Sequence, residues 1–484
     1  MKSLYQRFEG RGRDSLLHRN LRVCTEEGVL ATPWAILVVP GNVFIANLLT
    51  SVMGIGESMY GWIVSLPAWA NALQILLVPV LARRMSAWTM TIYAALINWG
   101  FWILLVVSLR RMPIEDPDAT GRLMLVYFAL ISLSQSIHGV SWMSWVQEWI
   151  PARLRGKYFG KRNRIIGLMT VTFLISVEHV FHKYGESMLA FEIILGLSVA
   201  LRLLSVYLLT HIYTPWSRPE KMIHEGASSR FSVLLKNRPF RNYLIYAAIQ
   251  AFLFSLTGPF APVFMSEYLD FSVSHQTHLL LLGTLGSAIA IPVWGRQFDR
   301  HGCRPIIILT GSAWMLGNYL WAILTPSLTW VLYFMFFWGG LFSGGILLGG
   351  FNLVLKLTPP SLKSSGISLH LAFTSIAAAF APILAGWILS TGWSFLPDGF
   401  LRYRILFLIQ PSLVILSFLI LSRVDEPKAS GLTSFNGAFR TMRLVLIQNG
   451  ILLAANISLF RIIRKGVTSV FENNKAGNKD APGP

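Results

Sequence analysis

The chain has 484 residues, of which 54% are apolar and 13% are charged. Soluble proteins are usually about one quarter charged, so this composition argues against a soluble enzyme. The net charge of +19 arises from 41 Lys and Arg against 22 Asp and Glu, which in a soluble chain would indicate nucleic acid binding. Here the basic residues lie between long apolar segments. We therefore interpret them as membrane topology signals and expect no nucleic acid partner.

Twelve apolar segments follow one another along the chain. Each is long enough to cross a bilayer, which takes about 20 residues of helix. Because the backbone must satisfy its own hydrogen bonds in lipid, we predict that each segment is a helix and that the protein is all-α. The predicted spans are residues 33–52, 59–82, 88–109, 122–147, 164–182, 188–212, 242–266, 277–297, 304–325, 328–355, 365–390 and 403–422.

The distribution of Lys and Arg predicts the topology. With the N-terminus in the cytoplasm, the inner segments up to the twelfth span hold 25 basic residues and the outer loops hold six. This asymmetry favours a multi-pass protein of the plasma (inner) membrane with both termini cytoplasmic. The first 30 residues contain no short apolar core followed by a small-residue cleavage site, so we expect no cleaved signal peptide.

The longest predicted loop divides the spans into two sets of six. Internal repeats of this kind are typical of transporters. The predicted domains are a cytoplasmic arm at 1–32, a six-helix bundle at 33–212, a cytoplasmic central loop at 213–241, a second six-helix bundle at 242–422, and a cytoplasmic tail at 423–484 with an amphipathic helix at about 436–464.

Several kinds of chemistry are absent from the sequence. We find no phosphate-binding loop of the ATPase type, no zinc-binding HExxH pattern and no aspartate pair within a span. The two cysteines, Cys24 and Cys303, both fall in predicted cytoplasmic segments, so we expect no disulfide and no metal cluster. We therefore expect neither an enzyme, nor ATP-driven transport, nor a cofactor.

A short motif between spans 8 and 9 indicates a family. Gly295, Asp299, Arg300, Gly302 and Arg304 have the spacing of a loop signature in which glycine is followed by aspartate, a basic residue, glycine and a further basic residue. This segment resembles the signature of the major facilitator superfamily. The resemblance implies twelve transmembrane helices in two pseudo-symmetric six-helix bundles, with a solute path between them and usually a monomeric protein.

The copy of this motif in the first half is degenerate. It keeps Arg83 but has alanine in place of the aspartate. The resemblance implies that such loops latch the cytoplasmic ends of the two halves. We therefore predict that Arg83 pairs with Glu148, and that Asp299 approaches the start of span 5 near residues 162–164. The basic residue Arg155, in the loop after span 4, belongs to the same group. The alternative is that these charges only fix the topology.

The resemblance also implies that spans 1, 2, 4, 5, 7, 8, 10 and 11 line the path. In span 4, six polar or tryptophan residues fall within an arc of about 120°, which indicates a face turned to a watery cavity or to another helix. They are Ser134, Gln135, His138, Ser141, Trp142 and Trp145. The substrate-binding candidates are Gln135, His138, Trp142, Asn42, Asn71, Gln74, Gln250 and Asn352, each of which could instead make a hydrogen bond between helices.

Ionisable residues within spans are costly and therefore informative. No Asp or Glu lies at mid-depth in spans 1, 4, 7 or 10, which leaves His138 and Glu178 as candidate proton carriers. Arg202 lies at mid-depth in span 6, which the resemblance places outside the path. We interpret Arg202 as structural.

Three hypotheses follow for the function. The first is a secondary active transporter that moves a small polar or amphipathic organic solute by alternating access, with protons or sodium as coupling ions. The second is proton-driven efflux of amphipathic compounds. The third is a transporter-like receptor or scaffold that moves nothing. In all three the partners are membrane lipid and, for the first two, a small-molecule solute.

Overall fold

The computed structural model describes residues 2–39, 41–212, 227–359, 362–392, 396 and 398–426. Within these ranges the regular structure is helical and contains no strand. Eleven of the described helices are long and apolar enough to cross a membrane, and the shorter apolar helix Val43–Val52 completes a twelfth crossing. The predicted all-α fold with twelve transmembrane helices is confirmed.

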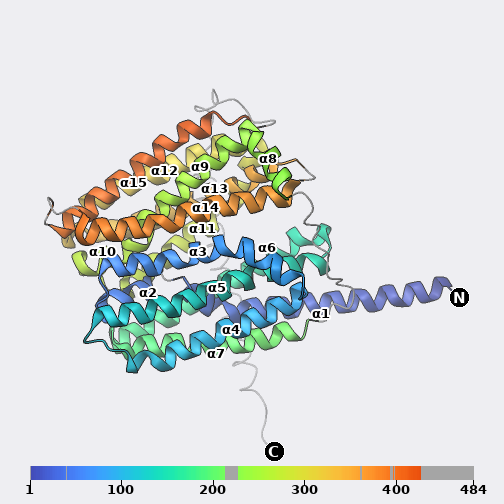
Figure 1. Cartoon of the computed structure of the whole chain (residues 1–484), viewed down its shortest axis with the longest axis horizontal. Helices are drawn as coiled ribbons and strands as arrows, with labels where there is room; N and C mark the ends of the chain where they lie inside the picture. Colours follow the sequence, from blue (N-terminus) through green and yellow to red (C-terminus); the bar gives the residue numbers. More distant parts are fainter. Residues whose placement is uncertain are drawn as a thin grey trace, which may run out of the picture.

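The helices form two groups that lie one above the other in Figure 1, with the N-terminal group in blue to green. The elements of the N-terminal bundle are α1 (Lys2–Leu37), α2 (Val43–Asn47), η1 (Leu48–Val52), α3 (Glu57–Ala82), α4 (Ala87–Ser108), η2 (Leu109–Arg111), α5 (Pro117–Trp149), α6 (Ala152–Tyr184) and α7 (Met188–Thr210).

The C-terminal bundle repeats this order after the connecting helix α8 (Ala227–Lys236). Its elements are α9 (Arg238–Thr257), η3 (Gly258–Phe260), α10 (Ala261–Leu269), α11 (Val273–His301), α12 (Cys303–Asn318), η4 (Tyr319–Ile323), η5 (Pro326–Leu328), α13 (Trp330–Leu357), α14 (Lys363–Trp387), η7 (Ile388–Gly392) and α15 (Gly399–Ser422).

The first crossing is broken in its middle, next to Asn42. Helix α1 ends at Leu37, and Asn42 lies before α2 with extended backbone angles. Its side-chain amide donates to the carbonyl of Ile36 at 2.7 Å, and its side-chain oxygen accepts from the backbone N–H of Ile45 at 2.9 Å. Asn42 therefore closes one helix and caps the next, which stabilises both otherwise open ends.

Some predicted boundaries differ from the observed ones. Helix α1 passes residue 33 without a break, so no helix end separates the predicted arm from the first span. The predicted central loop contains α8, and α9 begins at Arg238 rather than at 242. The amphipathic helix predicted at about 436–464 lies outside the described residues.

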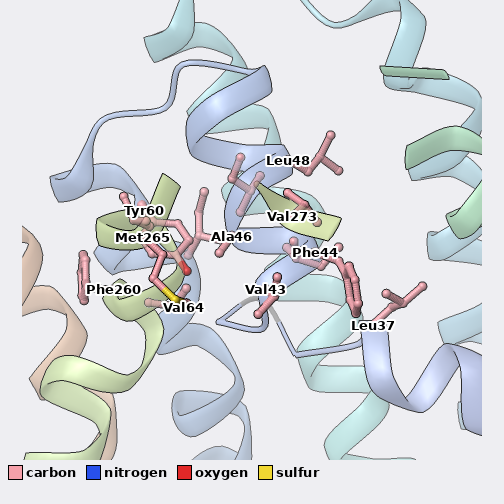
Figure 2. Close-up of a cluster of buried hydrophobic side chains, with 14 of the residues drawn as sticks. Leu37, Val43, Phe44, Ala46, Leu48, Tyr60, Val64, Phe260, Met265 and Val273 are labelled. Atoms are coloured by element: carbon pink, nitrogen blue, oxygen red, sulfur yellow. The ribbon is translucent and has the colours of Figure 1, made fainter. Parts of the chain in front are cut away.

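Three groups of buried apolar side chains show how the bundles meet. We name the two ends of the molecule after their labels in Figure 1: the α10 end, where α2 also lies, and the α8 end, from which α1 projects. The core at the α10 end contains residues of both bundles. Figure 2 shows a part of this shared core, with Val43, Phe44, Ala46, Leu48, Tyr60 and Val64 near Phe260, Met265 and Val273.

The other two cores lie toward the α8 end, and each belongs to one bundle. The first is built around Trp145 and Trp149 of α5, with Cys24 of α1. The second is built around Phe240 and Tyr243 of α9, with Cys303 of α12. Among the described residues, a common core therefore joins the bundles only at the α10 end.

Candidate functional site

The bundles approach most closely where α3 crosses α14. A Cβ atom added to Gly61 would overlap the carbonyl oxygen of Pro382, and one added to Gly386 would overlap the carbonyl oxygen of Glu57. The two helix backbones thus lie in direct contact, which only residues without a side chain permit. This reciprocal pair of glycines holds the α10 end together.

Polar contacts reinforce the same end. The Tyr60 hydroxyl donates to the carbonyl of Pro259 at 2.8 Å, and the backbone N–H of Val273 donates to Glu186 at 2.6 Å. Glu178, predicted as a proton carrier, lies 3.6 Å from the ring nitrogen of His278 on the opposite bundle. Its position supports a contact that closes this end.

Three of the predicted path residues carry a side-chain oxygen that has no hydrogen-bond partner in the described part of the chain. They are the buried amide oxygens of Gln74 in α3, Gln135 in α5 and Gln250 in α9. Asn71, one turn before Gln74, is exposed, and Asn352 in α13 is half-buried. Buried amide oxygens normally have a partner, so these positions remain candidates for solute contact.

The polar face predicted on α5 is divided between two environments. Ser134 accepts from Asn98 of α4 at 3.1 Å, and His138 contacts the carbonyl of Thr91 of α4 at 3.1 Å. These side chains point into the N-terminal bundle, toward helices that we expected to lie outside the path. Trp142 instead lies beside α6, with the Arg162 guanidinium 5.1 Å from its ring centre.

His138 is part of a buried network of charged and polar side chains, which we call the buried charge network. Its members are Glu27, His138, Arg162, Arg202 and Ser205. Arg202 donates to the Nε2 atom of His138 and to the Ser205 hydroxyl, each at 2.9 Å, and lies 3.5 Å from Glu27. Ser205 donates to Glu27 at 3.1 Å, and Arg162 donates to the second carboxylate oxygen at 3.3 Å. Glu27 is 3% exposed and Arg202 is 1% exposed.

These contacts define the protonation state of His138 in this conformation. A backbone carbonyl can only accept, so Nδ1 carries the proton that Thr91 receives. An arginine can only donate, so Nε2 is the unprotonated acceptor. His138 is therefore a neutral ring that joins α4 to α7. The prediction that it faces the solute path is wrong for this conformation.

Glu27 was missed by the sequence reasoning, because the predicted arm ended after it. The signal was Arg202, since a buried cation in a membrane helix needs a counter-charge. The Arg202 guanidinium also lies 4.3 Å from the ring centre of Trp34. Trp34 lies two turns after Glu27 on the same face of α1. Our interpretation of Arg202 as structural agrees with these contacts, and its side chain is fully buried.

The family motif adopts a tight turn between α11 and α12. Gly302 has a φ of +88°, which explains the glycine at that position. Gly295, Asp299 and Arg300 lie in the last turns of α11, and the last two are exposed. Arg304 donates to the carbonyl of Val424 at 2.7 Å, which ties the turn to the end of α15.

A carboxylate after α15 completes this attachment. Glu426 accepts from the backbone N–H groups of Cys303 at 2.9 Å and Arg304 at 2.7 Å, at the start of α12. Lys356, at the end of α13, donates to it at 2.9 Å. Burial alone would raise the pKa of Glu426, but the two N–H donors and Lys356 outweigh it and hold the pKa below its usual value.

The lowered pKa of Glu426 predicts a pH-dependent stability. The ionised carboxylate stabilises the fold at pH values above the ordinary pKa of glutamate. This stability is lost as the pH falls through the lowered pKa of Glu426. We expect Glu426→Gln to cost about 1–3 kcal/mol at pH 7 and to weaken the acid dependence of thermal unfolding below about pH 4.5. If the thermal stability of the parent protein and of Glu426→Gln falls equally with decreasing pH, the ionised Glu426 does not stabilise the fold.

The predicted latch is not formed in this conformation. Arg83 and Glu148 are both exposed, and no ion pair joins them in the part of the chain that the structure describes. Arg162, which we expected near Asp299, is engaged by Glu27. Arg155 donates to the carbonyls of residues 147 and 150 and so closes the end of α5. The latch stays a prediction for a conformation with the α8 end closed.

Gln250 also lies away from its predicted position. Its side-chain nitrogen donates to the Ser417 hydroxyl of α15 at 2.8 Å, so it faces an outer helix. His370 of α14 stacks on Tyr243 of α9, with ring centres 5.7 Å apart. Both contacts hold the C-terminal bundle together.

The two helical bundles share a core at one end and keep separate cores at the other. This architecture is that of a multi-pass membrane transport protein. The Major Facilitator Superfamily matches residues 35–272 and 243–471, which together cover most of the chain. The chain belongs to this superfamily of secondary transporters.

Solved structures of transporters share the fold. A mutant of the nucleoside transporter NupG and a D-xylose-proton symporter each give a TM-score of 0.64 at 14% identity, over 85% of this chain and 100% and 99% of theirs. A bacterial homologue of the human lysosomal transporter Spinster, inward-facing and unoccupied, gives 0.59 at 14% identity, over 84% and 96%. At these identities the likeness shows the fold alone.

One curated relative is similar over a short segment. The probable multidrug resistance protein EmrY of Escherichia coli (strain K12) is 30% identical over 135 residues, or 27% of this chain. The match spans about a quarter of that relative, 26% of its length.

Proposed function

We propose that the protein carries a small, uncharged, polar or amphipathic organic solute across the plasma membrane by alternating access. The main support for this proposal is that the bundles are joined at one end only. The shared core lies at the α10 end, and separate cores lie at the α8 end. This arrangement favours a path open toward the α8 end, which the charge distribution predicts to be cytoplasmic.

The side chains near the path favour a solute without net charge. The buried Glu27, Arg202 and Glu426 each have protein partners, which leaves amides such as those of Gln74 and Gln135 for a ligand. Amides suit hydroxyl and amine groups of neutral molecules. Nucleosides and xylose, the solutes named for two similar structures, are molecules of this class.

Binding is the first test of this proposal. Purified protein is screened by thermal shift against nucleosides, sugars, amino acids, organic acids and cationic drugs. A neutral solute at about 100 times its Kd should stabilise the fold by about 2.7 kcal/mol. We expect Gln135→Ala to weaken that binding about tenfold. Gln410→Ala, a buried amide of the outer helix α15, serves as the matched control and should leave it unchanged.

Proton coupling is the proposal for the driving force. His138 can take up a proton on Nε2 only by losing its contact with Arg202, which would connect protonation to movement of α7. If so, His138→Ala flattens the pH dependence of uptake into liposomes. An unchanged pH profile removes His138 from coupling and leaves sodium or uncoupled transport.

Efflux of amphipathic compounds is the second candidate. The local match to EmrY and the aromatic contact between Trp69 and Phe380, whose ring centres lie 5.0 Å apart between the bundles, favour it. Cationic drugs that stabilise the protein more than neutral solutes would support efflux. No stabilisation and no flux with any class would support the non-transporting alternative.

A further inference from the structure

A groove runs along the outside of the C-terminal bundle between α9, α14 and α15. Its volume is about 620 Å³, within the range of about 300–1,000 Å³ that is usual for small-molecule sites. Small side chains create the hollow: Ala248 of α9, Ala377 of α14 and Ser417 of α15 line it. Larger apolar side chains such as Phe252 and Leu416 form its walls.

Among the described residues, one charged side chain lines the groove, at one end. Arg423 directly follows the last residue of α15, so it lies where that helix leaves the membrane. Its side chain is exposed, and it joins no ion pair among the described residues. The nearest competing charge in the sequence is the exposed Asp425.

This combination of surfaces matches a lipid with an anionic headgroup. The apolar walls accept a hydrocarbon chain through van der Waals contact. A guanidinium at the membrane surface pairs well with a phosphate, because its planar set of N–H donors matches the phosphate oxygens. The position of Arg423 at the groove's end allows both contacts from one molecule.

We propose that this groove is a binding site for an anionic phospholipid, with an acyl chain between α9 and α15 and the phosphate on Arg423. The site lies on the outer surface of one bundle, separate from the path between the bundles. It therefore holds whether or not the proposed solute is transported.

The test uses the full-length protein in detergent, titrated with dioctanoyl-phosphatidylglycerol and dioctanoyl-phosphatidylcholine and followed by thermal shift. We expect tighter binding of phosphatidylglycerol. Arg423→Gln should reduce that preference about fivefold, the effect of one surface cation. Arg84→Gln removes an exposed arginine at the end of α3 and should leave the preference intact.

A second pair of variants tests the groove itself. Ala377→Phe fills it and should weaken binding of both lipids, whereas Ala200→Phe, at an exposed site on α7, should not. Equal binding of the two lipids, or equal effects of Arg423→Gln and Arg84→Gln, would overturn the proposal. If Ala377→Phe fails to fold, the two arginine variants still decide it.

Discussion

Glu27→Gln is expected to destabilise the N-terminal bundle by about 3–5 kcal/mol, because it leaves Arg202 and Arg162 without their common counter-charge. Arg202 is fully buried, so water cannot replace the carboxylate. The loss should appear as a large fall in the thermal unfolding temperature of the purified protein and in its yield from membranes.

The neighbouring residue supplies the control. Glu26 pairs with Arg22 on the surface, and Glu26→Gln should cost less than about 1 kcal/mol. Combining Glu27→Gln with Arg202→Met removes both charges, and we expect part of the stability to return. If Glu27→Gln and Glu26→Gln behave alike, the buried network does not stabilise the protein.

The second large effect is expected at the contact between α3 and α14. Gly61→Leu introduces a side chain where the backbone of Pro382 lies, so the α10 end cannot close as observed. We expect the population to shift toward a conformation open at the α10 end, and uptake to fall at least about tenfold, the equivalent of about 1.4 kcal/mol. Spin labels at Ser51→Cys and His275→Cys, on opposite bundles, should move apart.

A glycine without close neighbours tests the specificity of this effect. A Cβ added to Gly100 in α4 would have no atom of another described segment within 4 Å. Gly100→Leu should therefore leave both the label distance and the uptake near the values of the parent protein. An unchanged distance in Gly61→Leu would show that the glycine contact does not hold the α10 end closed.

Much of the fold could be predicted because lipid imposes strong constraints on the chain. Apolar length predicted the crossings. The residues from Gly295 to Arg304 predicted the family and the turn at Gly302. Each of these features depends on residues close together in the sequence.

The site was harder to predict because its contacts join distant helices. Helical periodicity grouped His138 with Gln135 on one face of α5, but it could not show that Arg202 of α7 would engage His138. Glu27 lay beyond the predicted first span, although it is the counter-charge of that arginine. Glu426, after the last crossing, was missed for the same reason: its partners come from α12 and α13.

The central claim is that the two bundles alternate between opening at one end and at the other. It is tested by two label distances in the same protein, with and without a stabilising solute. One pair is Ser51→Cys with His275→Cys at the α10 end, and the other is Arg84→Cys with Lys363→Cys at the α8 end, all at exposed positions. Solute should shorten the α8-end distance and lengthen the α10-end distance in part of the population. Two distances that stay fixed while a solute binds and crosses the membrane would contradict the account.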